Sequence, residues 1–222
     1  MRKWGTCFFE LYAQITLERL VGPEYELLVN LDKPDLQSPD HKTMGIEVTR
    51  AMKESKDVAK SLLKEMSGIK PREEIGFKQE DIDRMMNTGY SYGLVEGKII
   101  GTKEYDYWAM ALPLRRVIDS KVAKCISGFY GNFKSMGLYI FSKDPITYSQ
   151  AQHTCSHIRS LQKYHDKGYD RLFLSEISNL YVCNLEDGLA ASSRIVDYPI
   201  SLDMRREFYL EATRRNLETG QS

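Results

Sequence analysis

The spacing of apolar residues along the chain predicts a series of helices and strands. From Trp4 to Leu20 apolar residues recur at steps of three and four, which is typical of an amphipathic helix, and Gly22 with Pro23 predicts its end. Short apolar runs bounded by turn residues predict strands at 25–31, 46–49, 137–142, 171–175 and 180–183. Further helices are predicted at 50–66, 113–129 and 147–165, and from an N-cap at Asp203 to about Arg215. Because helices and strands alternate, we expect an α/β or α+β fold with a mixed central sheet flanked by helices.

One predicted strand carries a carboxylate among apolar residues. Glu47 lies between Ile46 and Val48, and in a strand it points to the opposite face from both. A carboxylate in a core strand is costly to bury without a partner, and a divalent cation with several oxygen ligands is one such partner. Asp35, upstream, is close enough in sequence to fold back beside Glu47. The two acids therefore predict a site at this strand.

In this arrangement the residues resemble the PD-(D/E)xK nuclease superfamily, whose core runs helix, three strands, helix, strand. Pro34 and Asp35 match the superfamily's Pro-Asp pair, and Glu47 matches the acid of its third strand. Glu10, on the first predicted helix, is placed like the glutamate that often completes the acidic cluster, although a solvated helix carboxylate is the simpler interpretation. The resemblance covers about the first third of the chain. It implies a restriction-endonuclease-like fold that hydrolyses phosphodiester bonds in nucleic acid, with DNA as the expected partner, and a Mg²⁺ or Mn²⁺ ion held by Glu10, Asp35 and Glu47.

The chain departs from the superfamily at Thr49, which stands where the pattern has lysine. That lysine positions the attacking water and stabilises charge in the transition state, whereas a threonine hydroxyl can hold a water but brings no charge. In variants of the superfamily another side chain takes the role, from the following helix or a neighbouring strand. The candidates here are Lys33, Gln37, Lys53 and Lys56. The expected catalytic set thus includes Gln37 and Thr49 besides the three acids. A catalytically inactive module of the same fold, binding nucleic acid or a protein partner, stays open, as does an unrelated α/β protein.

The resemblance makes a geometric prediction. Asp35 and Glu47 should lie on neighbouring strands within reach of one ion, with Glu10 facing them. If Asp35 lies on a remote loop, Asp40 of the next Pro-Asp pair takes its place. Converging carboxylates without a cation repel one another, so we expect the pKa of at least one of them to be raised.

Composition supports a single domain over residues 1–222, with a possible insertion near 68–112 that includes a hairpin or insertion at 90–107. The chain is 42% hydrophobic, and Lys+Arg and Asp+Glu both number 31, so net charge favours neither nucleic acid nor membrane. No apolar run approaches the roughly 20 residues of a membrane span. The apolar N-terminal stretch is interrupted by Glu10 and Gln14, so no signal peptide is expected. Four scattered cysteines without C-x-x-C indicate reduced thiols and a cytoplasmic location.

Other chemical signals are weaker. His153 and His157 are four apart and could share a zinc ion, but no third ligand is apparent, and ordinary polar helix residues are the favoured interpretation. No P-loop, G-x-G-x-x-G or G-x-S-x-G motif is present, so no nucleotide cofactor is expected. Four aromatic residues could stack on bases, although packing is the favoured use: Trp108, Tyr130, Phe133 and Tyr139.

Overall fold

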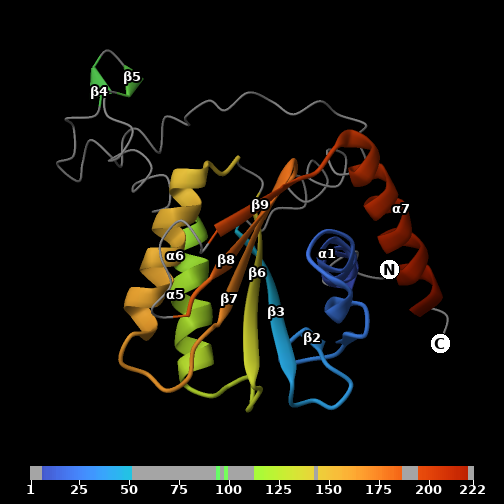
Figure 1. The fold of residues 1–222 in the computed structure, drawn as a ribbon, viewed down its shortest axis with the longest axis horizontal. Coiled ribbons are helices and arrows are strands. Elements are labelled where there is room, and N and C mark those ends of the chain that lie inside the picture. The colour runs from blue at the N-terminus through green and yellow to red at the C-terminus, as the bar shows by residue number, and fades with distance from the viewer. Residues whose placement is uncertain are drawn as a thin grey trace.

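A mixed sheet of seven strands lies between two layers of helices (Figure 1). The computed structural model describes residues 7–51, 94–95, 98–99, 113–142, 145–186 and 195–219. Helices α1 (Cys7–Leu20) and α7 (Leu202–Thr219) cover one face of the sheet, and α5 (Pro113–Ile126) and α6 (Tyr148–Gln162) cover the other. This arrangement confirms the predicted α/β class with a mixed sheet flanked by helices. No helix in these ranges is long and apolar enough to cross a membrane.

The sheet has the strand order β1-β2-β3-β6-β7-β8-β9. The strands are β1 (Val29–Asn30), β2 (Leu36–Gln37), β3 (Met44–Ala51), β6 (Ser135–Ser142), β7 (Arg171–Glu176), β8 (Asn179–Asn184) and β9 (Ile195–Pro199). The central strands β3, β6 and β7 are parallel, and the strands on either side join them in antiparallel pairs. A separate antiparallel pair, β4 (Leu94–Val95) and β5 (Lys98–Ile99), lies where a hairpin is predicted.

The core is divided by the sheet into two apolar clusters. On the α1 and α7 side, Ile46, Tyr139 and Phe208 belong to one cluster. On the α5 and α6 side, Leu138 and Ile158 belong to the other. Central strands in such a sheet are buried on both faces, which explains why β6 is a continuous apolar run rather than an alternating one.

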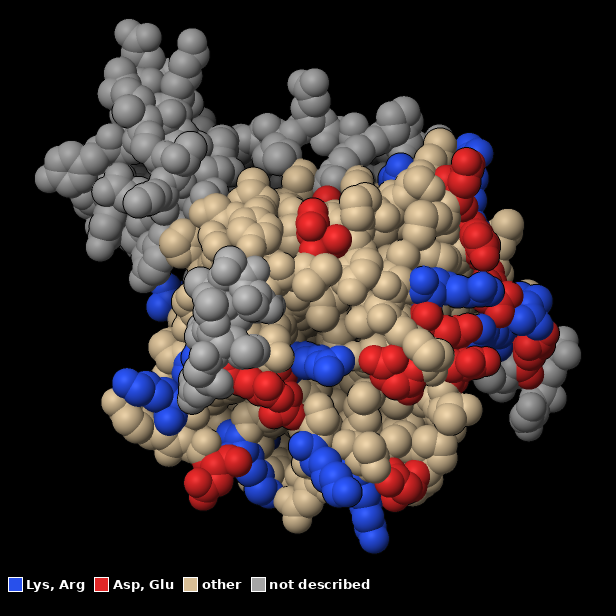
Figure 2. Space-filling view, in the orientation of Figure 1, with Lys and Arg blue, Asp and Glu red and all other residues tan. Residues whose placement is uncertain are grey.

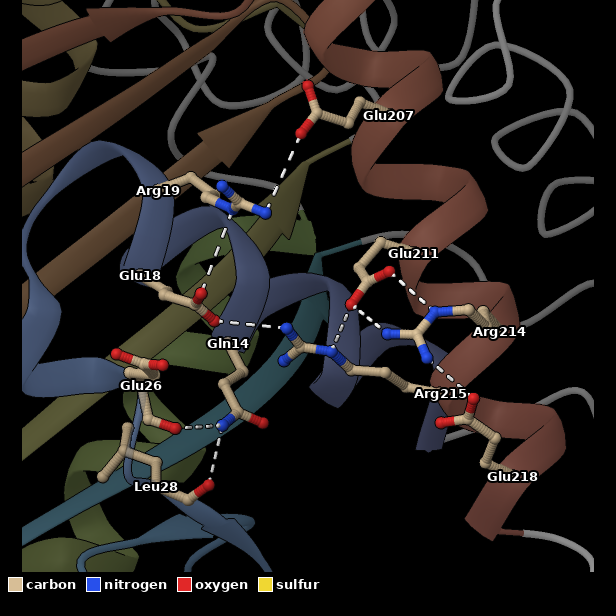
Figure 3. A network of polar contacts seen from close by, with 10 residues as sticks. All are labelled: Gln14, Glu18, Arg19, Glu26, Leu28, Glu207, Glu211, Arg214, Arg215 and Glu218. Atoms are coloured by element: carbon tan, nitrogen blue, oxygen red, sulfur yellow. Dashed lines mark hydrogen bonds and ion pairs between the residues drawn. The ribbon is translucent and has the colours of Figure 1, made fainter.

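Polar contacts connect the first and last helices of the described chain (Figure 3). Arg215 of α7 bonds Glu211 on its own helix (2.8 Å) and reaches Glu18 of α1 (3.4 Å). The Gln14 side chain of α1 donates to the carbonyl oxygens of Glu26 (3.3 Å) and Leu28 (2.7 Å). These bonds connect α1 both to α7 and to the segment that leads into β1.

Several predicted boundaries are wrong for physical reasons. The predicted strand at 25–31 is instead a 3-10 helix, η1 (Pro23–Tyr25), followed by the short β1. The Gln14 side chain donates hydrogen bonds to two backbone carbonyl groups of this segment, in place of a neighbouring strand. The predicted helix at 50–66 does not begin at Arg50, because β3 continues to Ala51 beside β6; residues 52–66 lie outside the described chain.

At the other end of the chain, Asp203 is not the N-cap of α7. The hydroxyl of Ser201 accepts a hydrogen bond from the backbone N–H of Met204 (3.2 Å), so the helix begins two residues earlier than an N-cap at Asp203 would place it. The prediction also misses β9, which is an exposed edge strand with little apolar alternation. In contrast, Thr147 forms the capping box with Gln150 that opens α6, close to the predicted start.

Candidate functional site

Asp35 lies beside the acid-bearing strand, as predicted. It directly precedes β2, whose first residue, Leu36, pairs with Ile46 of β3. Its Oδ2 accepts a hydrogen bond from the backbone N–H of Val48 (2.7 Å). This bond continues the contact between the two segments past the end of β2 and brings the carboxylate next to Glu47.

Asp40, the alternative aspartate, has a different role. It is exposed in the turn between β2 and β3, where its Oδ1 accepts from the Ser38 hydroxyl (2.6 Å) and from the N–H groups of Lys42 (3.0 Å) and Thr43 (2.9 Å). These hydrogen bonds, led by that of Ser38, lower the pKa of Asp40. The Asp40 carboxylate therefore stabilises a turn, and the first Pro-Asp pair is the one that reaches β3.

Glu47 lies in the middle of β3 and is only 6% exposed. Its neighbours Ile46 and Val48 pack into the cluster under α1, while Glu47 reaches α5 on the opposite face. There the ammonium of Lys121 forms a hydrogen-bonded ion pair with Glu47 Oε1. The Lys121 side chain is 20% exposed, so the pair lies at the border of the core.

The sequence prediction misses Lys121. On α5, Ile118, Val122 and Cys125 form the buried stripe that packs on the sheet, and Lys121 lies within that stripe. A lysine at such a position signals that its charge has a partner in the fold. The spacing cannot say that the partner is an acid 74 positions earlier.

The residues predicted to replace the superfamily's lysine are engaged elsewhere or lie outside the described chain. The Lys33 ammonium lies 5.4 Å from the ring centre of Phe129, and Gln37 donates to the Pro34 carbonyl (2.9 Å). Thr49 is half-buried two residues beyond Glu47 and is paired with Ile140 of β6. Lys53 and Lys56 lie outside the described residues.

Glu47 affects the pKa of each of the other two predicted acids. Burial, and next the charge of Glu47, raise the pKa of Asp35 to about 7. Burial also raises the pKa of Glu10; the charge of Glu47 adds to this, and a hydrogen bond from Asn30 Nδ2 to Glu10 Oε2 (2.7 Å) opposes it. The pKa is thus raised at both Asp35 and Glu10, chiefly by burial, with the charge of Glu47 adding to the rise.

Two buried tyrosines lie next to this charged pair. Tyr130 is 4% exposed, and burial followed by the charge of Glu47 raises the pKa of its hydroxyl. That hydroxyl has no hydrogen-bond partner among the described residues. The hydroxyl of Tyr169 donates to the Lys121 carbonyl (3.2 Å). Tyr130 and the fully buried Tyr139 are therefore packed inside rather than available to stack on bases.

The described residues do not bring the predicted metal ligands together as a set of three. Within the described ranges, no three His, Cys, Asp or Glu side chains lie together so that they could hold an ion. Lys121 and Asn30 engage Glu47 and Glu10, respectively. His157 Nε2 lies 2.8 Å from Asp119 Oδ1 and so connects α6 to α5.

The chain matches no protein-family model, no curated protein and no solved structure. The superfamily resemblance therefore rests on the chain's own residues and the order of its elements.

Proposed function

We propose that this protein is a divalent-cation-dependent hydrolase of phosphodiester bonds in nucleic acid, built on a restriction-endonuclease-like core. The observation that carries the proposal is the ion pair of Lys121 with Glu47, beside Asp35. It supports the proposal because it brings to the acids the positive charge that Thr49 does not provide. The following helix is one of the places from which such a lysine can come in the superfamily.

The order of elements also supports this proposal. If the 3-10 helix η1 and the separate β4–β5 pair are set aside, the described chain runs α1, then β1, β2 and β3, then α5 and β6, which matches the order of helix, three strands, helix and strand that the resemblance implies. Glu10 lies on the first helix, Asp35 at the second strand, Glu47 on the third and Lys121 on the next described helix. DNA is the expected substrate on the strength of the same resemblance.

Asp35 and Glu47 fit the needs of Mg²⁺ or Mn²⁺ without a third acid. Mg²⁺ is commonly bound through one or two carboxylates, with waters and substrate phosphate oxygens completing its shell. Glu10 lies on α1, whereas Glu47 reaches α5 on the opposite face of the sheet, and Glu10 Oε2 accepts a hydrogen bond from Asn30. A bound ion would lower the pKa of a water and offset charge on the scissile phosphate.

The chain's own groups would position and stabilise the phosphate. An ammonium has three N–H donors, so Lys121 can keep one on Glu47 and direct another to a phosphate oxygen. The Tyr130 hydroxyl, which like other tyrosine hydroxyls is protonated at neutral pH, is a further donor beside Glu47. Thr49 shares a strand face with Glu47 and can hold a water there.

Cleavage of mixed DNA and RNA substrates at low salt with Mg²⁺ or Mn²⁺ tests the proposal. Removing one preorganised charge or donor from such a site costs about 100- to 1000-fold in rate, so Asp35→Asn, Glu47→Gln and Lys121→Met should each lose at least about 100-fold. Asp40→Asn is the matched control, because it changes the other Pro-Asp pair at an exposed turn and should retain activity. Activity that survives in Glu47→Gln would contradict the assignment.

A non-catalytic module of the same fold is the second candidate. Two contacts favour it: Lys121 is paired with Glu47, and Asn30 donates a hydrogen bond to Glu10, so both acids have partners without a metal ion. A cation that binds only the native state raises the thermal midpoint. If Mn²⁺ raises the thermal midpoint of wild type and of His153→Ala but not that of Glu47→Gln, the acids hold the ion. If Mn²⁺ leaves the wild-type midpoint unchanged and wild type shows no cleavage, the non-catalytic module is supported.

A further inference from the structure

Two ammonium groups lie over an exposed aromatic ring at the end of α5. Phe129, just after α5, is 48% exposed. The Nζ atoms of Lys33 and Lys124 lie 5.4 Å and 5.3 Å from its ring centre. We refer to Phe129, Lys33 and Lys124 as the aromatic platform. It presents a flat apolar surface with positive charge, a combination suited to a planar anionic ligand.

The aromatic platform is carried by the same two segments as the acidic site. Lys33 is two residues before Asp35. Lys124 is three residues after Lys121 on α5, a rise of about 4.5 Å along the helix. The Phe129 N–H donates to the Lys124 carbonyl (3.1 Å), which connects the ring's backbone to the end of that helix. The platform therefore continues the site along α5.

Further lysines surround the turn that presents Phe129. The Lys167 ammonium bonds Asn132 Oδ1 (2.6 Å) and would lie 3.0 Å from a Cβ at Gly128. The backbone N–H of Lys134 donates to the Lys42 carbonyl (2.8 Å), so the backbones of two more lysines are adjacent at this end of β3 and β6. Charges of both signs are interspersed on the face shown in Figure 2. Local clusters such as this one, rather than a broad positive face in that view, would attract phosphates.

We propose that the aromatic platform binds an unpaired nucleotide, so that the chain prefers single-stranded nucleic acid to a continuous duplex; the placement of that nucleotide beside the scissile bond rests on the proposed function. In a duplex the faces of the bases are stacked on one another and cannot meet the Phe129 ring. An unpaired base can stack on the ring while its phosphates meet the lysines. The ammonium groups of Lys33 and Lys124 lie over the ring, so they would move from it toward the backbone phosphates when a base stacks there.

Fluorescence anisotropy in EDTA tests this proposal without any cleavage. The probes are a short labelled single-stranded DNA and a duplex of the same sequence. Wild type should bind the single strand more tightly. Phe129→Ala should weaken that binding about 5- to 150-fold, the range found when one stacked base loses its aromatic partner, and Phe129→Trp should restore it. Lys124→Gln and Lys33→Gln should each reduce the slope of log K against log salt by about 0.7.

Tyr148→Ala is the matched control. Tyr148 is an exposed aromatic residue at the N-terminus of α6, outside the aromatic platform, so its substitution should leave binding unchanged. Phe129 is exposed, so Phe129→Ala should keep the wild-type circular dichroism and thermal midpoint. Wild-type affinity of Phe129→Ala for the single strand, or tighter binding of wild type to the duplex, would overturn the proposal. If Phe129→Ala loses binding while wild type shows no cleavage, the platform stands and the hydrolase function fails.

Discussion

Glu47 is a buried carboxylate whose charge depends on one partner. Its side chain is 8% exposed, and that of Lys121 is 20% exposed. Burial removes both groups from water, and their attraction offsets this cost only while both are present. The net stability that the pair adds is therefore small, whereas the loss of either partner alone is costly.

Lys121→Met should leave Glu47 buried without its counter-ion and lower the free energy of unfolding by about 3 kcal/mol at neutral pH. The double variant Lys121→Met/Glu47→Leu should recover most of this loss, because no charge then stays buried. Urea unfolding followed by circular dichroism measures both values. A single variant as stable as wild type would mean that the ion pair is open in solution.

At this scale the acids were predictable and the lysine was not. Asp35 and Glu47 are close in sequence, and the alternation around Glu47 already indicates which face it takes. Glu10 lies on the first helix, but its carboxylate accepts a hydrogen bond from Asn30, and no three-acid cluster is found among the described residues. Lys121 reaches Glu47 only because α5 packs across the sheet, and this contact has no signature in local spacing.

Among the elements, α7 is a helix with a network of ion pairs between its acidic and basic side chains. Glu211 accepts hydrogen bonds from Arg214 (2.7 Å) and Arg215 (2.8 Å), which lower its pKa to about 2. Arg214 also reaches Glu218 (2.7 Å), and Arg215 reaches Glu18 of α1 (3.4 Å). The Glu211 carboxylate is thus the shared acceptor in the network shown in Figure 3.

Glu211→Gln should lower the free energy of unfolding by about 0.5–1 kcal/mol at pH 7, as expected for an accessible ion-pair network. Because the folded pKa lies below the ordinary value of 4.5, the stabilisation is complete above about pH 4.5 and is lost as pH falls toward about 2. Chemical unfolding of both proteins from pH 7 to pH 2 should therefore show curves that converge in acid.

The more exposed Glu207, which lies 3.9 Å from Arg19, is the matched control. Glu207→Gln should change stability by less than about 0.5 kcal/mol at every pH. A constant gap between wild type and Glu211→Gln down to pH 2 would show that the effect of Glu211 does not come from its charge.

Elements with strong apolar runs were predictable, and elements defined by their neighbours were not. β6 and β7 are buried on both faces, so β6 carries a continuous apolar run and β7 the shorter run 172–174. β9 is exposed at the edge, where only pairing with β8 makes it a strand. The segment before β1 has an apolar sequence, but the Gln14 amide on α1 competes for its carbonyl groups.

At the scale of the whole molecule, the first and last described helices pack against each other on one face of the sheet (Figure 1). Phe208 of α7 is buried, and its ring centre lies 6.1 Å from that of Tyr12 on α1. Elements from both ends of the chain therefore share one apolar cluster with the central strands.

Phe208→Ala should lower the free energy of unfolding by about 3–5 kcal/mol, because it opens a cavity between α1, α7 and the sheet. Leu210→Ala, two residues further on the exposed side of the same helix, should change it by less than about 0.5 kcal/mol. Thermal unfolding followed by circular dichroism and by tyrosine fluorescence should give one common transition for wild type. If Phe208→Ala and Leu210→Ala cost the same, α7 is not part of the cooperative unit.

The long separation between Glu47 and Lys121 also has a consequence for synthesis of the chain. A ribosome adds about 5–20 residues per second, so the 74 positions that separate the two residues take about 4–15 s. During this interval the growing chain already contains Glu10, Asp35 and Glu47 but not the ammonium that pairs with Glu47. β6, which pairs with β3 along its whole length, is completed later still. On the proposed function, a nascent chain would therefore stay inactive until α5 has emerged and folded against β3.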